Sequence, residues 1–271
     1  MSLSIKDSGT WKEPTKLEVK DGGAWKEVIT GSIKDGGSWK PFYTRKFTYT
    51  VSSDVNQLDL DAVLSDDNKL GDVDVIIPNS VYVTSNSTGT PALRTGSGVA
   101  GILTIINNGY IYGAGGNGGA GNRGFANGYA GSAGGTALYL EKAITLDNNG
   151  SILGGGGGGG GGSGGQNWHG GFSQSYSYGS GGGGGGGASY GSGASGGSGA
   201  GSGSNAAVYH GGGGGSATAD DGADGGVGGA GGNIGQAGSA GANTNSSGNV
   251  GGSGGAAGTA IDNNGNTRTG D

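Results

Sequence analysis

The run of nine consecutive glycines from Gly154 to Gly162 constrains this chain most. Glycine loses more conformational freedom on folding than any other residue and offers no side chain to bury, so an isolated polyglycine segment holds no structure. Similar runs follow at Gly181–Gly187 and Gly211–Gly215. The block is therefore either a flexible linker or a bundle of extended, polyproline-II-like segments that satisfy their backbone groups by hydrogen bonding sideways to one another.

Aromatic residues between the glycine runs favour the ordered bundle, because a linker has no need of them. Short polar and aromatic inserts alternate with the glycine runs, a pattern that predicts rods joined by loops. The inserts contain Phe125 and Tyr129; Trp168, His169, Phe172, Tyr176 and Tyr178; Tyr190; and Tyr209 and His210.

Composition excludes several classes of protein. Most of the 75 glycines follow Tyr112, and hydrophobic residues make up 31% of the 271-residue chain, below the ~45–50% that is usual for a globular domain. Glycine does not recur at every third place, which excludes collagen. The chain has no cysteine and a net charge of −6, with the negative charge concentrated after residue 46. Disulfides are thus excluded and nucleic acid is not expected as a partner.

The N-terminal segment contains a sequence repeated three times with a period of 14 residues. Each copy places a β-branched residue, an Asp-Gly-Gly or Asp-Ser-Gly turn and a tryptophan at equivalent positions, which predicts three short β-hairpins. Such hairpins are too small to fold alone. The tryptophans either dock on a trimeric partner, one to each subunit, or form a small internal core. The equivalent residues are Trp11, Trp25 and Trp39, and Ile5, Val19 and Ile33.

The chain between this repeat and the glycine block is predicted to be β-rich. Residues 46–51 and 72–77 alternate apolar and polar side chains, and 81–84 is a third strand candidate. A second repeat relates 104–113 to 145–154, and we expect both copies to be rungs or hairpins that start the glycine rods. The fold class is mostly β and irregular. The predicted parts are an attachment segment (1–46), a β-rich connecting domain (47–112) and a glycine-rich polyglycine-II domain with loops at one tip (113–271).

The chain has few residues that could bind a metal or catalyse a reaction. The two histidines, His169 and His210, have no further ligand at a recognised spacing, so no metal and no cofactor are expected. The many glycine-pattern matches to nucleotide-binding motifs lack a following Lys-Ser or Lys-Thr. We therefore expect no enzyme. No stretch approaches 18 apolar residues and no signal-peptide pattern is present, so neither a membrane span nor export by a signal peptide is expected.

Residues 101–258 resemble the receptor-recognising tip adhesins of bacteriophage long tail fibres, best known from T-even-type phages. The motifs that carry this resemblance are Asn107-Asn-Gly-Tyr-Ile-Tyr-Gly-Ala-Gly-Gly-Asn-Gly-Gly119 and Asn148-Asn-Gly-Ser-Ile-Leu-Gly154. It implies a virion protein at the distal tip of a tail fibre, with an attachment domain and a sandwich of polyglycine-II helices. It also implies binding to a porin-type outer-membrane protein or lipopolysaccharide of a Gram-negative host. Residues 1–46 depart from that family and resemble short segments in tail and fibre proteins of other phages.

Our prediction is an adhesin, one copy of which caps a trimeric tail-fibre protein and binds a receptor through aromatic loops. The alternatives are a structural or ice-binding glycine-rich protein without a specific receptor, or a disordered glycine-rich adhesive. Each loop aromatic could instead pack between loops and stiffen the tip. The candidate receptor-binding residues are Arg123, Phe125, Asn127 and Tyr129; Gln166, Asn167, Trp168, His169, Phe172, Tyr176 and Tyr178; Tyr190; and Asn205, Tyr209 and His210.

Overall fold

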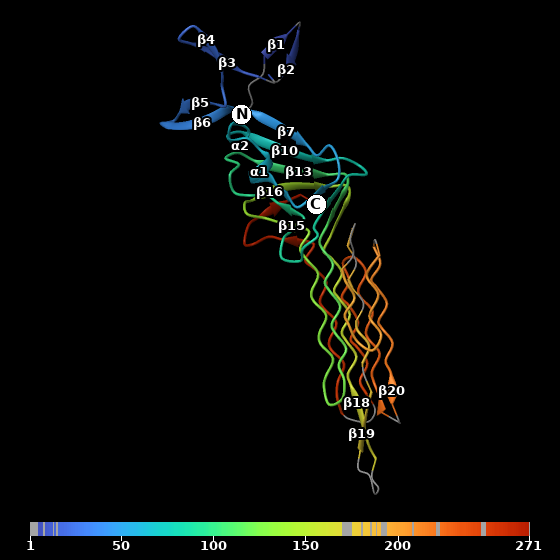
Figure 1. The fold of residues 1–271 in the computed structure, drawn as a ribbon. Helices are drawn as coiled ribbons and strands as arrows, with labels where there is room; N and C mark the ends of the chain where they lie inside the picture. The colour runs from blue at the N-terminus through green and yellow to red at the C-terminus, as the bar shows by residue number, and fades with distance from the viewer. Residues whose placement is uncertain are drawn as a thin grey trace.

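The protein has three parts arranged along one direction: N-terminal hairpins, a β-solenoid and a long glycine bundle (Figure 1). The fold was analysed in a computed structural model. Neither of its two helices is long or apolar enough to cross a bilayer, among the residues that the structure describes. These residues are 5–7, 9–12, 14, 16–169, 175–179, 181–184, 186–187, 189–190, 194–207, 209–220, 223–244 and 248–270.

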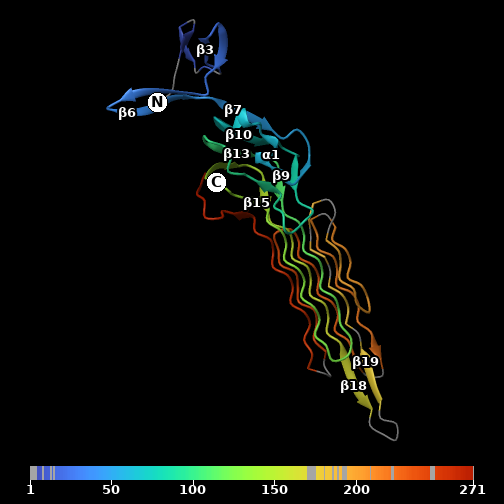
Figure 2. The ribbon, with the colours of Figure 1, turned by 60° about the vertical axis from the view of Figure 1, so that its left-hand side comes forward.

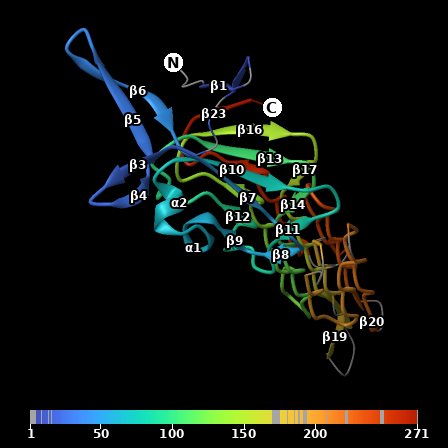
Figure 3. The ribbon, with the colours of Figure 1, turned by 90° about the horizontal axis from the view of Figure 1, so that it is seen from above.

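Each copy of the 14-residue repeat forms an antiparallel pair of strands. In the second and third copies both turn glycines have positive φ (59° and 89° at Gly22 and Gly23, 58° and 86° at Gly36 and Gly37), as a tight two-residue hairpin turn requires. The three hairpins point in different directions from the N-terminal end of the solenoid (Figure 3). The pairs are β1 (Ile5–Asp7) with β2 (Thr10–Lys12), β3 (Glu18–Asp21) with β4 (Ala24–Glu27), and β5 (Thr30–Asp35) with β6 (Ser38–Thr44).

The tryptophans of these hairpins do not form an internal core. Trp25 is 66% exposed and Trp39 is 70% exposed. The side chains of Ile5 and Trp11 lie outside the described part of the structure. Of the two interpretations of the repeat, the internal core is therefore wrong for Trp25 and Trp39, because both residues lie on separate two-stranded ribbons and their side chains stay more than half exposed.

Residues from 46 onward wind into a solenoid of three parallel sheets, which the chain visits in turn. Within each sheet every neighbouring pair of strands is parallel. The first sheet contains β7 (Lys46–Thr50), β10 (Asp72–Ile77), β13 (Leu103–Asn107), β16 (Ile144–Asn148) and β23 (Arg268–Thr269). The second contains β8 (Val55–Asn56), β11 (Tyr82–Thr84), β14 (Tyr110–Tyr112) and β17 (Ser151–Leu153). The third contains β9 (Leu58–Asp59), β12 (Leu93–Arg94), β15 (Leu138–Tyr139) and β22 (Ile261–Asp262).

The second sequence repeat is explained by the solenoid. Its two copies lie side by side in register, with Ile105 opposite Leu146 and Ile111 opposite Ile152. The buried Asn107 donates from its Nδ2 to Oδ1 of Asn148 at 2.7 Å, which continues the same register through the turn. Inward-facing aliphatic side chains of successive coils fill the interior: Leu58, Leu60, Val73, Val75, Ile77, Val83, Leu93, Leu103, Ile105, Ile111, Leu138, Leu140, Ile144 and Leu146.

Two one-turn helices, α1 (Leu60–Val63) and α2 (Asp66–Lys69), connect the first coil to the second. Aspartate carboxylates in and just before these helices accept hydrogen bonds from backbone N–H groups. Asp59 caps α1 by accepting from Asp61 N at 3.0 Å, and Asp61 accepts from Ser97 N and Gly98 N, each at 3.0 Å. These aspartates thus hold turns together, as turn residues do.

Both glycine excursions leave the solenoid at the same corner, between the second and third sheets. Residues 113–137 connect β14 to β15, and residues 154–260 connect β17 to β22. Residues 138–153 and 261–269 return to the sheets begun by residues 46–112, so the compositional boundary at Tyr112 marks where the first excursion begins. The excursions run side by side as a bundle (Figure 2). The described residues of these excursions include four short strands: β18 (Gly165–His169), β19 (Ser175–Gly179), β20 (Ala219–Asp220) and β21 (Ala223–Asp224).

The nine-glycine run donates its backbone hydrogen bonds to different neighbours in rotation. Gly157 N and Gly160 N donate to Gln236 O and Ser239 O, both at 2.9 Å. Gly155, Gly158 and Gly161 donate to Gly135, Ser132 and Tyr129, at 2.8–3.0 Å. Each neighbouring segment thus accepts a hydrogen bond from every third residue of the run.

Glycine is required in this run because the neighbouring backbones approach too closely for any side chain. A Cβ added at Gly158 would overlap the carbonyl oxygen of Asn117, and one at Gly160 would overlap that of Gly252. These carbonyl oxygens belong to the backbone, and they cannot move aside without breaking the hydrogen bonds that they accept. Close approach, rather than turn geometry, therefore explains the composition of the bundle.

Candidate functional site

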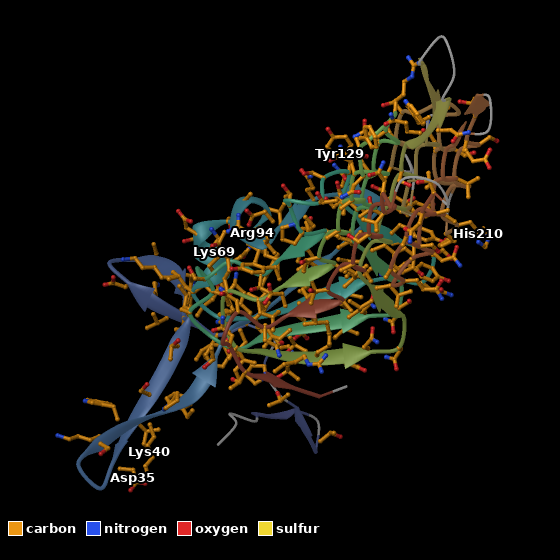
Figure 4. The ribbon with its side chains drawn as sticks, turned by 90° about the horizontal axis from the view of Figure 1, so that it is seen from below. Asp35, Lys40, Lys69, Arg94, Tyr129 and His210 are labelled. Atoms are coloured by element: carbon orange, nitrogen blue, oxygen red, sulfur yellow. The ribbon has the colours of Figure 1, made fainter. Side chains whose placement is uncertain are left out.

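The candidate site residues divide between the two ends of the glycine bundle. The far end, away from the solenoid, carries the loop 122–127 and the hairpin formed by β18 and β19 (Figure 1). The near end, which faces the solenoid, carries Tyr190, Asn205, Tyr209 and His210. Figure 4 shows Tyr129 and His210 on different sides of the bundle. A single surface therefore does not include all the residues that the sequence suggested.

The far end is joined together through the backbone of Gly164, just before β18. Gly164 N donates to Ala126 O at 3.0 Å, which attaches the first loop to the second excursion. Asn249 Nδ2 donates to both Gly164 O and Gly124 O, each at 2.9 Å. Thr244 Oγ1 donates to Gly164 O at 3.5 Å. Segments up to 125 residues apart in the sequence thus hold one another in place.

Among the side chains that the structure describes at this end, three large aromatic ones are exposed. Phe125 is 70% exposed, Tyr129 is 62% exposed and Trp168 is 54% exposed. The backbone of Tyr129 belongs to the bundle, because its N donates to Ala120 O and its carbonyl accepts from Gly161 N. A hydrogen-bonded backbone therefore presents the ring of Tyr129 to solvent.

The hairpin of β18 and β19 projects furthest from the solenoid. Trp168 pairs with Tyr176 across the two strands, and Gln166 pairs with Tyr178. The side chain of Gln166 is buried, and neither of its amide atoms has a hydrogen-bond partner within the described part of the chain. Phe172 lies outside the described residues. For His169, Tyr176 and Tyr178 the structure describes the strand but not the side chain.

Asn127 stiffens its loop. Its Oδ1 accepts from Val250 N at 2.9 Å, and its carbonyl accepts from Asn122 Nδ2 at 3.1 Å. Arg123 also lies in this loop and is exposed, and Asn167 is half-buried in β18. Asn127 therefore positions the aromatic residues on either side of it in the sequence.

Sequence reasoning missed three contributors to the far end. Asn249 and Thr244 tie the loops together as described above. The short pair β20–β21 packs against β18 and β19, and a Cβ at Gly165 would overlap Asp224 O. An asparagine or threonine where a glycine run is interrupted is the signal that could have identified the first two.

The near-end tyrosines pack against the second sheet of the solenoid. The ring of Tyr190 stacks on that of Tyr82 with centroids 3.8 Å apart and planes at 5°, and Tyr82 stacks on Tyr110 at 4.5 Å. Tyr209 lies edge-on to Tyr112 at 6.0 Å. Burial raises the pKa of Tyr112, Tyr190 and Tyr209 above the ordinary value for a phenol. Tyr190 and Tyr209 therefore pack against the solenoid and not at the far end of the bundle.

The other two near-end candidates also lie far from the tip. Asn205 Oδ1 accepts from Gly196 N at 3.0 Å, which ties together two glycine segments. His210 is exposed, and its N donates to Ala207 O at 3.3 Å. In the described residues, no three His, Cys, Asp or Glu side chains gather as a metal site. That the protein is no enzyme and needs no cofactor stays a prediction.

Comparisons with known proteins show which proteins this chain is similar to. Residues 46–270 match the family model described as phage tail fibre adhesin Gp38. The chain is also similar to a chain in the crystal structure of the gp37-gp38 adhesin tip complex of the bacteriophage S16 long tail fiber. That match has 22% sequence identity and a TM-score of 0.50, and covers 83% of this chain and 78% of the other. A search of curated proteins found no match.

Proposed function

Because the chain belongs to the phage tail fibre adhesin Gp38 family and is therefore a virion protein of the tail fibre, we propose that it caps the distal tip of that fibre. It binds a receptor on the host surface through the far end of the glycine bundle. The receptor is a porin-type outer-membrane protein or lipopolysaccharide. The observation that carries this proposal is the exposure of Phe125, Tyr129 and Trp168 at one end of the bundle.

The bundle works as a rigid support for the loops. The three-residue spacing of its lateral hydrogen bonds supports the interpretation of the glycine segments as polyglycine-II helices. Rigidity matters because a loop that is already ordered loses less entropy on binding. Asn249 extends this order to the tip by joining Gly124 to Gly164.

The residues at the far end suit protein or glycan recognition. Tyrosine and tryptophan supply large contact areas with few rotatable bonds, while serine, glycine and asparagine add adaptable hydrogen bonds. Exposed aromatic side chains of this kind usually dominate the binding energy of an interface. We therefore assign Phe125, Tyr129 and Trp168 as the main receptor contacts, with the rest of the β18–β19 hairpin beside them.

The N-terminal hairpins attach the protein to the fibre in this proposal. Lys20 lies directly opposite Trp25, and Val19 lies opposite Lys26, so Trp25 and Val19 are on opposite faces of one hairpin. Trp39 and Ile33 are arranged in the same way. Burying both faces requires protein on both sides, which a groove between two subunits provides.

A trimeric fibre protein would offer one such groove for each of the three hairpins. The S16 adhesin tip, in which gp37 and gp38 form a complex, supports a fibre partner of this kind here. The hairpins lie outside the region matched by the family model, so this mode of attachment rests on the repeat itself. The proposed attachment residues are Trp11, Trp25 and Trp39 with Ile5, Val19 and Ile33.

A cell-binding assay tests the receptor proposal. Purified protein is added to host strains that each lack one outer-membrane protein or carry truncated lipopolysaccharide. We expect binding to disappear on one of these strains. The double variant Phe125→Ala/Trp168→Ala should lose at least ~30-fold in affinity on the parent strain, as expected for truncated hot-spot aromatics.

The matched control is His210→Ala, which changes an exposed candidate residue at the opposite end of the bundle. It should bind like the unaltered protein, and all variants should show the same melting temperature. Equal losses in the tip variant and in His210→Ala would contradict the assignment to the far end. Equal binding to every strain, or to none, would instead favour a structural or ice-binding role, which a thermal-hysteresis assay would detect.

A further inference from the structure

The third sheet of the solenoid presents a row of polar and aromatic side chains on its outer surface. Strand register places Asp59, Arg94, Tyr139 and Asp262 next to one another in four successive parallel strands. The residues that precede them in the strands, Leu58, Leu93 and Leu138, are at most 2% exposed. Because side chains alternate along a strand, the row faces outward while the leucines face the core.

A cleft of about 370 Å³ lies over this row, within the range of small-ligand sites. Arg94, Tyr139 and Asp262 line it on the sheet side, and Thr136 and the connector Thr88–Pro91 form its rim. Figure 4 places Arg94 on the solenoid, away from Tyr129 of the bundle and from Lys40 of the β5–β6 hairpin. The cleft is therefore separate from both surfaces assigned above.

The walls of the cleft are held by hydrogen bonds. Ser85 Oγ donates to Thr90 O at 2.7 Å, and Ala92 N donates to Thr136 O at 3.2 Å, so the connector is fastened to the sheet. The guanidinium of Arg94 donates to Glu141 Oε1 at 2.6 Å and lies 3.6 Å from Asp59, yet its side chain is still 41% exposed. A guanidinium has five N–H donors, and the exposed ones remain available to a ligand.

The side chains that line the cleft suit some classes of ligand better than others. Arg94 is outnumbered by Asp59, Glu141 and Asp262, so a phosphate or another anion would meet net negative charge. A purely apolar ligand would find one aromatic ring among hydroxyl and charged groups. A sugar ring fits better, because its C–H face can lie on Tyr139 while its hydroxyls bond to carboxylate, guanidinium and threonine groups.

We propose that this cleft is a binding site for a neutral saccharide, distinct from the receptor surface at the far end of the bundle. Tyr139 supplies the ring face, Asp262 accepts from sugar hydroxyls, and Arg94 donates to them. A second, weaker contact of this kind on the side of the solenoid would hold the protein near a glycan-covered surface. The proposal does not depend on the tip assignment, since none of its residues lies in the bundle loops.

Saturation-transfer NMR and titration calorimetry on the full chain test the site. The probes are maltose, lactose and diacetylchitobiose at millimolar concentration, with glucose 6-phosphate as the anionic comparison. We expect at least one neutral disaccharide to bind, and to bind more tightly than the phosphorylated sugar. Tyr139→Ala should weaken that binding by at least about tenfold, whereas Tyr139→Phe, which keeps the ring face, should retain most of it.

Two further variants make the result specific. Asp262→Asn should weaken binding, and Tyr129→Ala, which removes an exposed tyrosine at the far end, should leave it unchanged. Melting curves check that each variant is folded. The proposal is overturned if no neutral disaccharide binds, if the anionic sugar binds best, if Tyr139→Ala binds like the unaltered protein, or if Tyr129→Ala abolishes binding.

Discussion

The phenol of Tyr209 donates a hydrogen bond to the phenol of Tyr82 at 3.0 Å, although 127 residues separate them in the sequence. Tyr82 belongs to the second sheet of the solenoid, and Tyr209 belongs to a loop at the near end of the bundle. The ring of Tyr190 stacks on that of Tyr82 and is tilted against that of Tyr209. This tyrosine cluster attaches the later glycine segments to the solenoid.

Alkaline pH should weaken this attachment. Burial first, and then the bond to Tyr82, raise the pKa of Tyr209, and burial raises that of Tyr190. A phenol with a raised pKa in the folded state binds its proton more tightly than in the unfolded chain. Its contribution is therefore complete below the unfolded value of 10.0 and is lost as pH rises above it.

Urea unfolding between about pH 8 and pH 11 measures this effect. The midpoint should fall above pH 10, and the fall should be smaller in Tyr209→Phe, which cannot ionise at this position. Tyr129→Phe, at an exposed tyrosine, should show the same pH dependence as the unaltered protein. A Tyr209→Phe midpoint that falls as steeply as the parent's would show that the cluster is not the cause.

Glycines within the bundle should differ sharply in their tolerance of alanine. Gly160→Ala should lower the free energy of unfolding by ~1–3 kcal/mol or more, because the added methyl overlaps the Gly252 carbonyl. Gly213→Ala is the matched control, since its nearest neighbour would be Ser204 Oγ at 3.9 Å. It should be neutral or stabilising by up to ~1 kcal/mol, because alanine restricts the unfolded chain. Chemical denaturation measures the free energy of unfolding of both variants. Equal changes at Gly160 and Gly213 would argue against close packing of the glycine segments.

The hairpin tryptophans should matter for assembly and not for the stability of the free protein. Trp25 and Trp39 are more than half exposed, so the double variant Trp25→Ala/Trp39→Ala should change the free energy of unfolding by less than ~0.5 kcal/mol per site. Co-purification with the fibre protein should nevertheless fail. Phe125→Ala/Tyr129→Ala, which changes two exposed aromatic residues at the far end of the bundle, should still co-purify. Retention of the tryptophan variant on the fibre would refute attachment through these side chains.

Removing the Asn249 amide should loosen the far end of the bundle. Asn249→Ala leaves the carbonyls of Gly124 and Gly164 without this donor, at a cost of ~1–2 kcal/mol for two hydrogen bonds. Hydrogen exchange should accelerate in residues 122–127, and receptor binding should weaken although no contact residue has changed. Asn263→Ala, at an exposed position in the C-terminal turn, is the control. Exchange rates in this loop that match those of the control would rule out the bridging role.

The sequence by itself determined the features that are local or compositional. A nine-glycine run admits no packed structure except one in which backbones touch, and the Cβ overlaps at Gly158 and Gly160 agree with this. The 14-residue repeat specifies three hairpins, because its turn sequence, Asp-Ser-Gly or Asp-Gly-Gly, sets where the chain reverses between the strand residues of each copy. The motifs around Asn107 and Asn148 also pointed to the adhesin family that the comparison then established.

Only the tertiary structure decided how these pieces combine. Strands of two or three residues, such as β9 and β12, are too short to show a period, and their parallel partners lie tens of residues away. The stacking of coils that places Asp59, Arg94, Tyr139 and Asp262 in one row is therefore invisible in the sequence. So is the direction of each glycine segment, which sends Trp168 to the far end and Tyr209 back to the solenoid. Polyglycine carries no side chains to mark direction or neighbours, and the choice is made by long-range packing at its ends.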